Sequence, residues 1–107
     1  MNETYNSGSV LLVNGLIFEH DWKMNTKQRV CVVLDDASAE SPITVVPLSE
    51  STYETNVVII EPDDENGLDR ASHAVCDQRT TVNSAQVVRL IGEIHSDDLK
   101  DIRSRLR

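Results

Sequence analysis

Apolar residues occur in this chain as short runs separated by turn-forming and charged residues. Runs of this length, rich in valine and isoleucine, are typical of buried β-strands. They lie at residues 10–13, 30–34, 43–48, 57–60, 73–76 and 87–94. Pro47 indicates that the third strand ends there or lies at a sheet edge, because proline cannot donate a hydrogen bond to a neighbouring strand. Residues 19–28 are polar and aperiodic, which predicts a long loop of the kind that often carries function.

The C-terminal segment has a helical pattern instead. Ser96 is the expected N-cap, and Asp97 and Asp98 follow in the first turn, where carboxylates stabilise a helix. One apolar face is predicted from the residues Leu99, Ile102 and Leu106. A helix with such a face packs on the sheet or on a partner subunit.

These elements predict one small domain of mainly β (α+β) class. Its sheet is expected to be mainly antiparallel and strongly bent, closer to a small barrel than to an alternating βαβ chain. We expect a flexible N-terminal tail at residues 1–7 and a single domain at 8–107. The thin hydrophobic core of a chain this short favours a homodimer.

Charge is distributed unevenly along the chain. The formal net charge is −8, and residues 35–69 carry ten acidic side chains and no basic one. This balance argues against a protein that coats nucleic acid through net charge alone, but a fold can place an acidic, solvated segment on one face and keep another face neutral or basic. The acidic stretch 61–67 lacks the ligand register of an EF-hand, so calcium binding has little support.

Localisation and cysteine chemistry follow from simple patterns. No apolar run reaches the length of a membrane span, and the N-terminal residues lack the pattern of a signal peptide, so a cytoplasmic protein is expected. Cys31 and Cys76 lie in separate apolar runs, which favours two small buried residues over a metal site or a redox pair.

Candidate catalytic residues lie in loops beside the ends of predicted strands, since the sequence contains no Walker loop, nucleophile elbow or HExxH motif. The candidates are His20, Lys23, Lys27 and Arg29 around the first loop, Ser49, Ser51 and Thr52 after the third strand, and residues 77–81 after the fifth. A histidine, an arginine, a hydroxyl and a carboxylate suffice for phosphodiester cleavage without a metal.

Several short segments stand in a recognisable order. They are residues 8–13 (GSVLLV), 29–34 (RVCVVL), 44–49 (TVVPLS), 72–78 (SHAVCDQ) and 91–94 (IGEI), followed by a helix that begins with acidic residues. In this order they resemble the MazF/PemK/Kid family of toxin endoribonucleases, the mRNA interferases. The resemblance runs from Gly8 to Leu106 and implies a small SH3-like antiparallel β-barrel with a C-terminal α-helix, shared by MazF and CcdB.

The resemblance also implies a role for each matching residue. Arg29 matches a catalytic arginine that contacts the scissile phosphate, Ser49 a catalytic hydroxyl, and Asp77 an acid–base aspartate of Kid-like members. His20 lies in the first loop, where some members place a functional histidine. The residues expected to bind RNA are Trp22, Lys23, Lys27, Ser51, Thr52, Gln78, Arg79 and Thr80.

The function implied is that of the toxin in a type II toxin–antitoxin module. Such a toxin cleaves single-stranded RNA or mRNA at selected sequences, through 2′-hydroxyl attack, without metal or cofactor. Its partners are a MazE-like antitoxin segment and a second copy of the toxin. Two alternatives stay open: a CcdB-like gyrase poison that uses the C-terminal helix, and a degenerate member that binds RNA or antitoxin without cleavage. The degenerate alternative is kept open because this chain has Thr80 at the position of the family's usual arginine, and its own arginine, Arg79, stands one place earlier.

Overall fold

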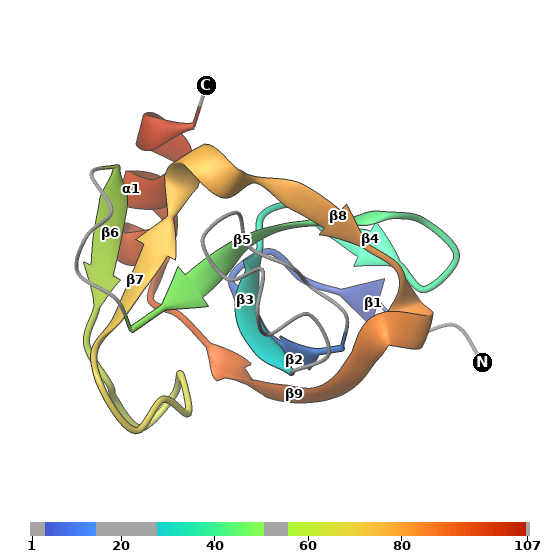
Figure 1. The fold of residues 1–107 in the computed structure, drawn as a ribbon, viewed down its shortest axis with the longest axis horizontal. Helices are drawn as coiled ribbons and strands as arrows, with labels where there is room; N and C mark the ends of the chain where they lie inside the picture. Colours follow the sequence, from blue (N-terminus) through green and yellow to red (C-terminus); the bar gives the residue numbers. More distant parts are fainter. Residues whose placement is uncertain (1–3, 15–27, 51–55, 107) are drawn as a thin grey trace.

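The computed structural model describes residues 4–14, 28–50 and 56–106. Its main sheet is antiparallel, with the strand order β6-β7-β5-β3-β2-β9, and β8 also pairs with β5 (Figure 1). The strands are β2 (Ser9–Val13), β3 (Arg29–Val33), β5 (Ile43–Ser49), β6 (Val57–Ile60), β7 (Ser72–Val75), β8 (Thr80–Val82) and β9 (Val87–Glu93). The sheet curls into a small barrel, which confirms the predicted fold class.

Both faces of the central strands are buried, and this explains the continuous apolar runs in the sequence. Along β3, Val30 and Val32 contact one hydrophobic cluster, whereas Cys31 and Val33 contact another on the opposite face. The first, the helix-side core, contains Val10, Val32, Leu34, Val46, Leu48, Val58, Ile60, Ala74, Cys76, Ile94 and Ile102. The second, the barrel core, contains Leu11, Val13, Cys31, Val33, Ile43, Val45 and Val82.

Pro47 lies in the interior of the sheet, so the prediction that it marks a sheet edge or a strand end is wrong. One side of β5 pairs with β3, and the other pairs with β8 at residues 43–45 and with β7 at residues 48–49. The Leu34 N–H donates to Thr44 O at 2.9 Å, so Thr44 of β5 is a residue whose backbone groups point toward β3. Since this direction alternates along a strand, the backbone groups of Pro47, three residues later, point away from β3. Pro47 therefore stands between the two neighbours, where a missing N–H costs no ladder bond.

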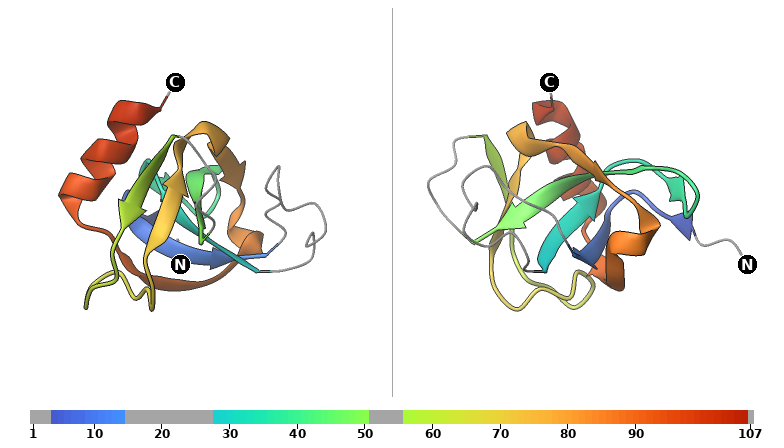
Figure 2. Two further views of the ribbon diagram at one scale, coloured as in Figure 1. Left: turned by 60° about the vertical axis from the view of Figure 1, so that its left-hand side comes forward. Right: turned by 45° about the vertical axis from the view of Figure 1, so that its right-hand side comes forward.

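The C-terminal helix α1 (Ser96–Arg105) forms as predicted but begins with a different cap. His95 is the N-cap, and its Nδ1 accepts a hydrogen bond from the Asp97 N–H at 3.1 Å. Ile102 is fully buried, and the two leucines of the predicted apolar face pack beside it on the helix-side core. The helix lies against β6 (Figure 2). Within the described ranges, no helix is long and apolar enough to cross a membrane.

The predicted N-terminal tail is partly incorporated into the fold. Strand β1 (Thr4–Tyr5) pairs with β4 (Ala37–Ser38), and the Ser7 N–H donates to Asp36 Oδ1 at 2.7 Å. Residues 4–7 are therefore held by the β3–β4 segment. Gly8 follows with a φ of +91°, a turn conformation that glycine adopts without strain.

The acidic loop between β6 and β7 is held together by its own polar groups. Asn66 is 1% exposed, and its side-chain amide donates to Glu61 O at 2.8 Å while its oxygen accepts two backbone N–H groups. The loop backbone passes directly against Gly92 of β9, where a Cβ atom would lie 2.4 Å from Glu65 O. The loop is therefore an ordered part of the fold, and its acidic residues are exposed to solvent.

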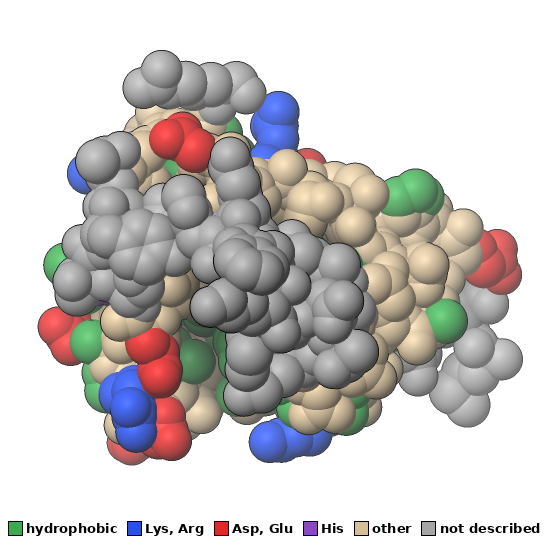
Figure 3. Space-filling model, viewed as in Figure 1, with side chains coloured by type: hydrophobic (Ala, Val, Ile, Leu, Met, Phe, Trp, Pro, Cys, Tyr) green, Lys and Arg blue, Asp and Glu red, His purple; other side chains and the backbone are tan. Residues whose placement is uncertain are grey.

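The negative charge of the middle third is exposed but does not gather on one face. The segments 35–40 and 61–69 lie at separate places in the ribbon (Figures 1 and 2). Arg70, immediately after the acidic third, lies 3.5 Å from Glu50 and 4.0 Å from Asp69. Figure 3 shows acidic and basic side chains beside one another in this region, at the lower left. The acidic segment is solvated, as expected, but it forms at least two separate patches.

Both cysteines behave as small buried residues, which confirms the prediction made from their positions. Cys31 lies in the barrel core and Cys76 in the helix-side core, and neither forms a disulfide. Burial raises the pKa of the Cys31 thiol to about 12, and burial also raises the pKa of Cys76. A thiol of this kind stays protonated at neutral pH and is a poor nucleophile.

Candidate functional site

Three polar residues line up across adjacent strands at one end of the barrel. Ser49, the last residue of β5, lies directly opposite His73 of β7. On the other side of β5, Cys31 of β3 lies opposite Pro47, where the pairing of these two strands ends, and Arg29 and Ser49 each lie two residues beyond this pair at the same end of the sheet. We call His73, Ser49 and Arg29 the rim row.

The rim row lies on the face of the sheet that points away from α1. The residues next to it on the same strands, Val30, Leu48 and Ala74, all contact the helix-side core. Since successive side chains of a strand point to opposite faces, the row must point to the other side. All three of its residues are half-buried. The alternation that packs the core thus also places these polar side chains at an accessible edge of the barrel.

Arg29 lies at the start of β3, opposite Val13 at the end of β2. Its Nη1 donates a hydrogen bond to Gln28 O at 3.3 Å. The segment that joins these two strands contains the first predicted loop. The sequence-predicted residues that lie outside the described part of the chain are His20, Trp22, Lys23, Lys27, Ser51 and Thr52.

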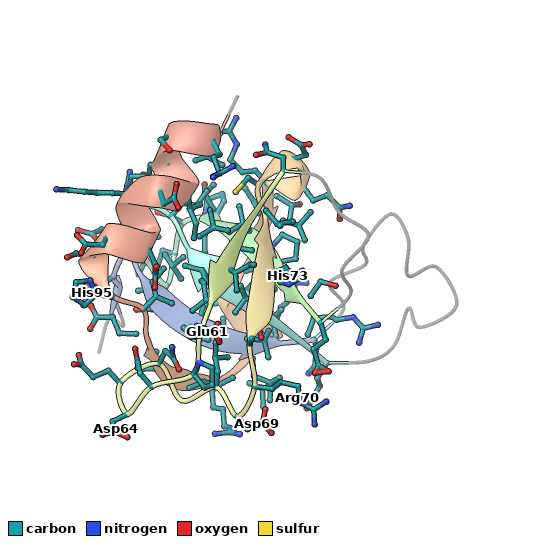
Figure 4. All side chains as sticks on the ribbon, turned by 90° about the vertical axis from the view of Figure 1, so that its left-hand side faces the viewer. Glu61, Asp64, Asp69, Arg70, His73 and His95 are labelled. Atoms are coloured by element: carbon teal, nitrogen blue, oxygen red, sulfur yellow. The ribbon has the colours of Figure 1, made fainter. Side chains whose placement is uncertain are left out.

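His73 was not among the residues selected from the sequence, which assigned residues 73–76 to a strand and nothing more. Its Nδ1 atom is buried and has no hydrogen-bond partner among the residues that the structure describes. Figure 4 shows His73 within β7, separated from the charged residues Asp64 and Asp69 of the preceding loop. A signal was present in the sequence: if Ala74 and Cys76 face the core, alternation sends His73 to the opposite face.

Asp77 lies in a different part of the molecule from the start of β3. It belongs to the 3₁₀ turn η2 (Cys76–Gln78), and its Oδ1 accepts a hydrogen bond from Asn56 Nδ2 at 2.7 Å. The same amide donates to Arg105 O at 3.1 Å, so Asp77 is joined to the end of α1. The ribbon views place η2 and the start of β3 at opposite ends of the barrel (Figures 1 and 2).

The residues after Asp77 do not continue β7. Gln78 ends η2 and is half-buried, Arg79 is an exposed connector, and Thr80 begins β8 opposite Val45. Arg79 stands one place before the family's usual arginine, and within a regular strand such a shift would turn its side chain to the other face of the sheet. Because the chain leaves β7 before Arg79, the shift does not prevent this arginine from taking the place of the family's usual one.

The arginines of the C-terminal helix are engaged within the protein. Arg103 Nη1 lies 3.3 Å from Asp35 Oδ1, and its Nη2 donates to Leu34 O. Arg105 Nε lies 3.3 Å from Asp101 Oδ1, one helical turn earlier. These contacts stabilise the last turn of α1 and its attachment to the sheet.

Comparison with known proteins identifies a family that has this fold and this order of residues. A family model described as "PemK-like, MazF-like toxin of type II toxin-antitoxin system" matches residues 8–107. The chain belongs to the PemK/MazF toxin family. Members of this family are in general endoribonucleases. The family resemblance inferred from the sequence segments is thereby confirmed.

A solved structure supports the same assignment at the level of the fold. MazF (Form-I) from Deinococcus radiodurans is similar, with a TM-score of 0.74 and 15% sequence identity over 97% of this chain and 94% of that chain. At this identity the likeness establishes the shared fold, and the roles of single residues have to be argued from the site itself. Comparison with curated protein sequences gave no match.

Proposed function

We propose that this PemK/MazF toxin is a sequence-selective, metal-independent endoribonuclease that cleaves single-stranded RNA. The observation that supports the proposal most is the position of Arg29 and Ser49 at the same end of two neighbouring strands. A guanidinium group keeps its charge and binds phosphate oxygens with two parallel hydrogen bonds. A hydroxyl at the same end of the barrel can contact the RNA bound by this arginine, so the two residues suit a phosphodiester substrate.

The proposed reaction is a transesterification within the RNA. A base removes the proton of the ribose 2′-hydroxyl, the 2′-oxygen attacks phosphorus, and the bond from phosphorus to the 5′-oxygen breaks. The departing 5′-oxygen takes up a proton, which leaves a 2′,3′-cyclic phosphate and a 5′-hydroxyl end. In this reaction Arg29 would stabilise the negative charge that develops on the equatorial phosphate oxygens, and Ser49 would hold one of them.

Sequence selection would come from the loops around the rim row and from the segment between η2 and β8. Single-stranded RNA is bound through phosphate contacts, base stacking on aromatic rings and contacts to base edges. Trp22 is the proposed stacking residue, with backbone and base contacts proposed for Lys23, Lys27, Ser51, Thr52, Gln78, Arg79 and Thr80. His20 is proposed to assist proton transfer. Asp77 is hydrogen-bonded to Asn56 at the other end of the barrel and is not given this role. The active form is proposed to be a homodimer in the cytoplasm, inhibited by an antitoxin segment that covers the site.

The experiment that tests this function uses purified protein and a long, mostly unstructured RNA in EDTA. We expect discrete fragments with 5′-hydroxyl ends. Arg29→Ala should lower the cleavage rate by about 100-fold or more, the range that follows loss of one transition-state donor. Arg89→Ala is the matched control, because Arg89 is an exposed arginine on β9 and should leave the rate unchanged.

Three outcomes would contradict the proposal. RNA that stays intact in EDTA, with the wild-type protein folded, would argue for the binding-only alternative and against cleavage. Cleavage at a site that carries 2′-deoxyribose at the scissile position would refute the 2′-hydroxyl mechanism. Inhibition of DNA gyrase without RNA cleavage would support the CcdB-like alternative.

A further inference from the structure

We propose that His73 is the general base of this site, the group that removes the proton of the ribose 2′-hydroxyl. The inference rests on the proposed ribonuclease function and names a residue that the family resemblance did not supply. It is carried by the position of the histidine beside Ser49 and by the state of its ring.

The first observation is the position of His73 in the sheet. It lies directly opposite Ser49 on β5 and opposite Ile59 on β6. Directly opposed residues of antiparallel strands have Cβ atoms about 4.5–5.5 Å apart, so the imidazole and the hydroxyl are close neighbours on one face. Arg29 lies at the start of β3, at the same end of the sheet. A phosphodiester held by Arg29 and Ser49 then presents its ribose within reach of the imidazole.

The second observation is the state of the imidazole ring. Nδ1 is buried and finds no hydrogen-bond partner among the described residues, which costs about 1–3 kcal/mol for a buried polar atom. The residue as a whole is half-buried, and its neighbour Ile59 is 56% exposed, so solvent reaches this end of the row. Because Nδ1 lies on the buried side of the ring, the substrate would meet the other ring nitrogen, Nε2, and no hydrogen bond at Nδ1 fixes which nitrogen carries the proton.

The other acid–base candidates are less well placed. Of the three histidines in the chain, His95 caps α1 and His20 lies outside the described residues. Asp77 accepts a hydrogen bond from Asn56, at the end of the barrel where α1 closes. Among the described residues, His73 is the titratable side chain that stands in the same row as Ser49 and Arg29.

The proton transfer is balanced as follows. The neutral imidazole accepts the proton of the 2′-hydroxyl as the 2′-oxygen forms its bond to phosphorus. The bond from phosphorus to the 5′-oxygen breaks, and this oxygen takes its proton from water. The imidazolium then returns its proton to the solvent, so the protein is unchanged after each turnover.

The test compares steady-state cleavage kinetics of the wild type, His73→Val and His73→Gln, in EDTA and from pH 5 to 9. The wild-type rate should rise with pH at the acidic end and then level off, because a general base has to be deprotonated to act. Both variants should lose about 100-fold or more in kcat, keep KM for RNA within about threefold, and lose the acidic limb of the profile. Free imidazole should restore part of the activity of His73→Ala.

Controls separate this inference from a structural role and from the function itself. His73→Val should be at least as stable to heat as the wild type, because the substitution removes an unpaired polar atom, and His95→Gln should keep the wild-type rate. If Arg29→Ala abolishes cleavage while His73→Val and His73→Gln keep the wild-type rate and pH profile, the inference is wrong and the ribonuclease function stands. A raised KM with unchanged kcat would also overturn it. Absence of cleavage by the wild type would overturn both.

Discussion

Cys31 connects burial of one residue to the pH dependence of the whole fold. Burial raises the pKa of its thiol from 9.0 to about 12, so the folded protein keeps this proton at pH values where the unfolded chain has released it. More protons are then bound in the folded than in the unfolded state, and stability falls as pH rises through this range. The contribution of Cys31 is fully present below pH 9 and is lost progressively between pH 9 and 12.

We therefore predict that the free energy of unfolding falls by up to about 1.4 kcal/mol per pH unit above pH 9 because of this one thiol. Urea titrations at pH 8, 9, 10 and 11 under reducing conditions measure the slope. Cys31→Ala should make the slope shallower. Val33→Ala removes volume from the same barrel core without a titrating group, so it should lower stability at every pH and leave the slope as in the wild type. Equal slopes for Cys31→Ala and the wild type would contradict the prediction.

The site residues differ in how far the sequence could locate them. Arg29 and Ser49 were selected by resemblance to a family, but their alignment in one row depends on the β3–β5 register, which a single sequence does not reveal. His73 was missed because a histidine inside an apolar run usually belongs to a strand and needs no other explanation. Asp77 was grouped with them because of its family position, whereas the 3₁₀ turn carries it toward Asn56.

Among the elements, those with strong local patterns were predicted and those that depend on tertiary pairing were not. The six apolar runs correspond to strands of the main sheet, and the predicted helix is present. Strands β1, β4 and β8 have two or three residues each and carry no pattern of their own. They form only because a partner strand lies beside them in the fold. The interior position of Pro47 also depends on tertiary pairing, since β5 changes its partner from β8 to β7 at this residue.

The N-terminus of α1 provides a test at the level of an element. His95 Nδ1 accepts the Asp97 N–H, whereas Ser96 lies one residue inside the helix and does not cap it. We expect His95→Ala to lower the free energy of unfolding by about 0.5–1 kcal/mol, and Ser96→Ala to change it by less than about 0.5 kcal/mol. Chemical denaturation at pH 7.5 measures both. If Ser96→Ala is the more destabilising of the two, the cap has been assigned to the wrong residue.

The whole molecule is small for the amount of apolar surface it has to cover. Val88 and Leu90 of the outer strand β9 are 42% and 63% exposed. A folded chain of this size buries a modest fraction of its surface, and association with a second copy covers more. We predict that sedimentation equilibrium at micromolar concentration gives twice the 12.0 kDa mass of one chain. A mass of one chain at every concentration tested would contradict the homodimer.

The two-sided sheet also has an evolutionary consequence. Along β3, β5 and β7, the residues that hold the fold and the residues of the rim row occupy alternate positions, so mutation can change one set without unpacking the other. Val30, Leu48 and Ala74 are constrained by the volume of the core, whereas the three residues beside them would, under the proposed function, be constrained by the substrate. Selection can therefore explore new active-site chemistry on an unchanged scaffold, and this helps to explain how chains with 15% identity keep one architecture.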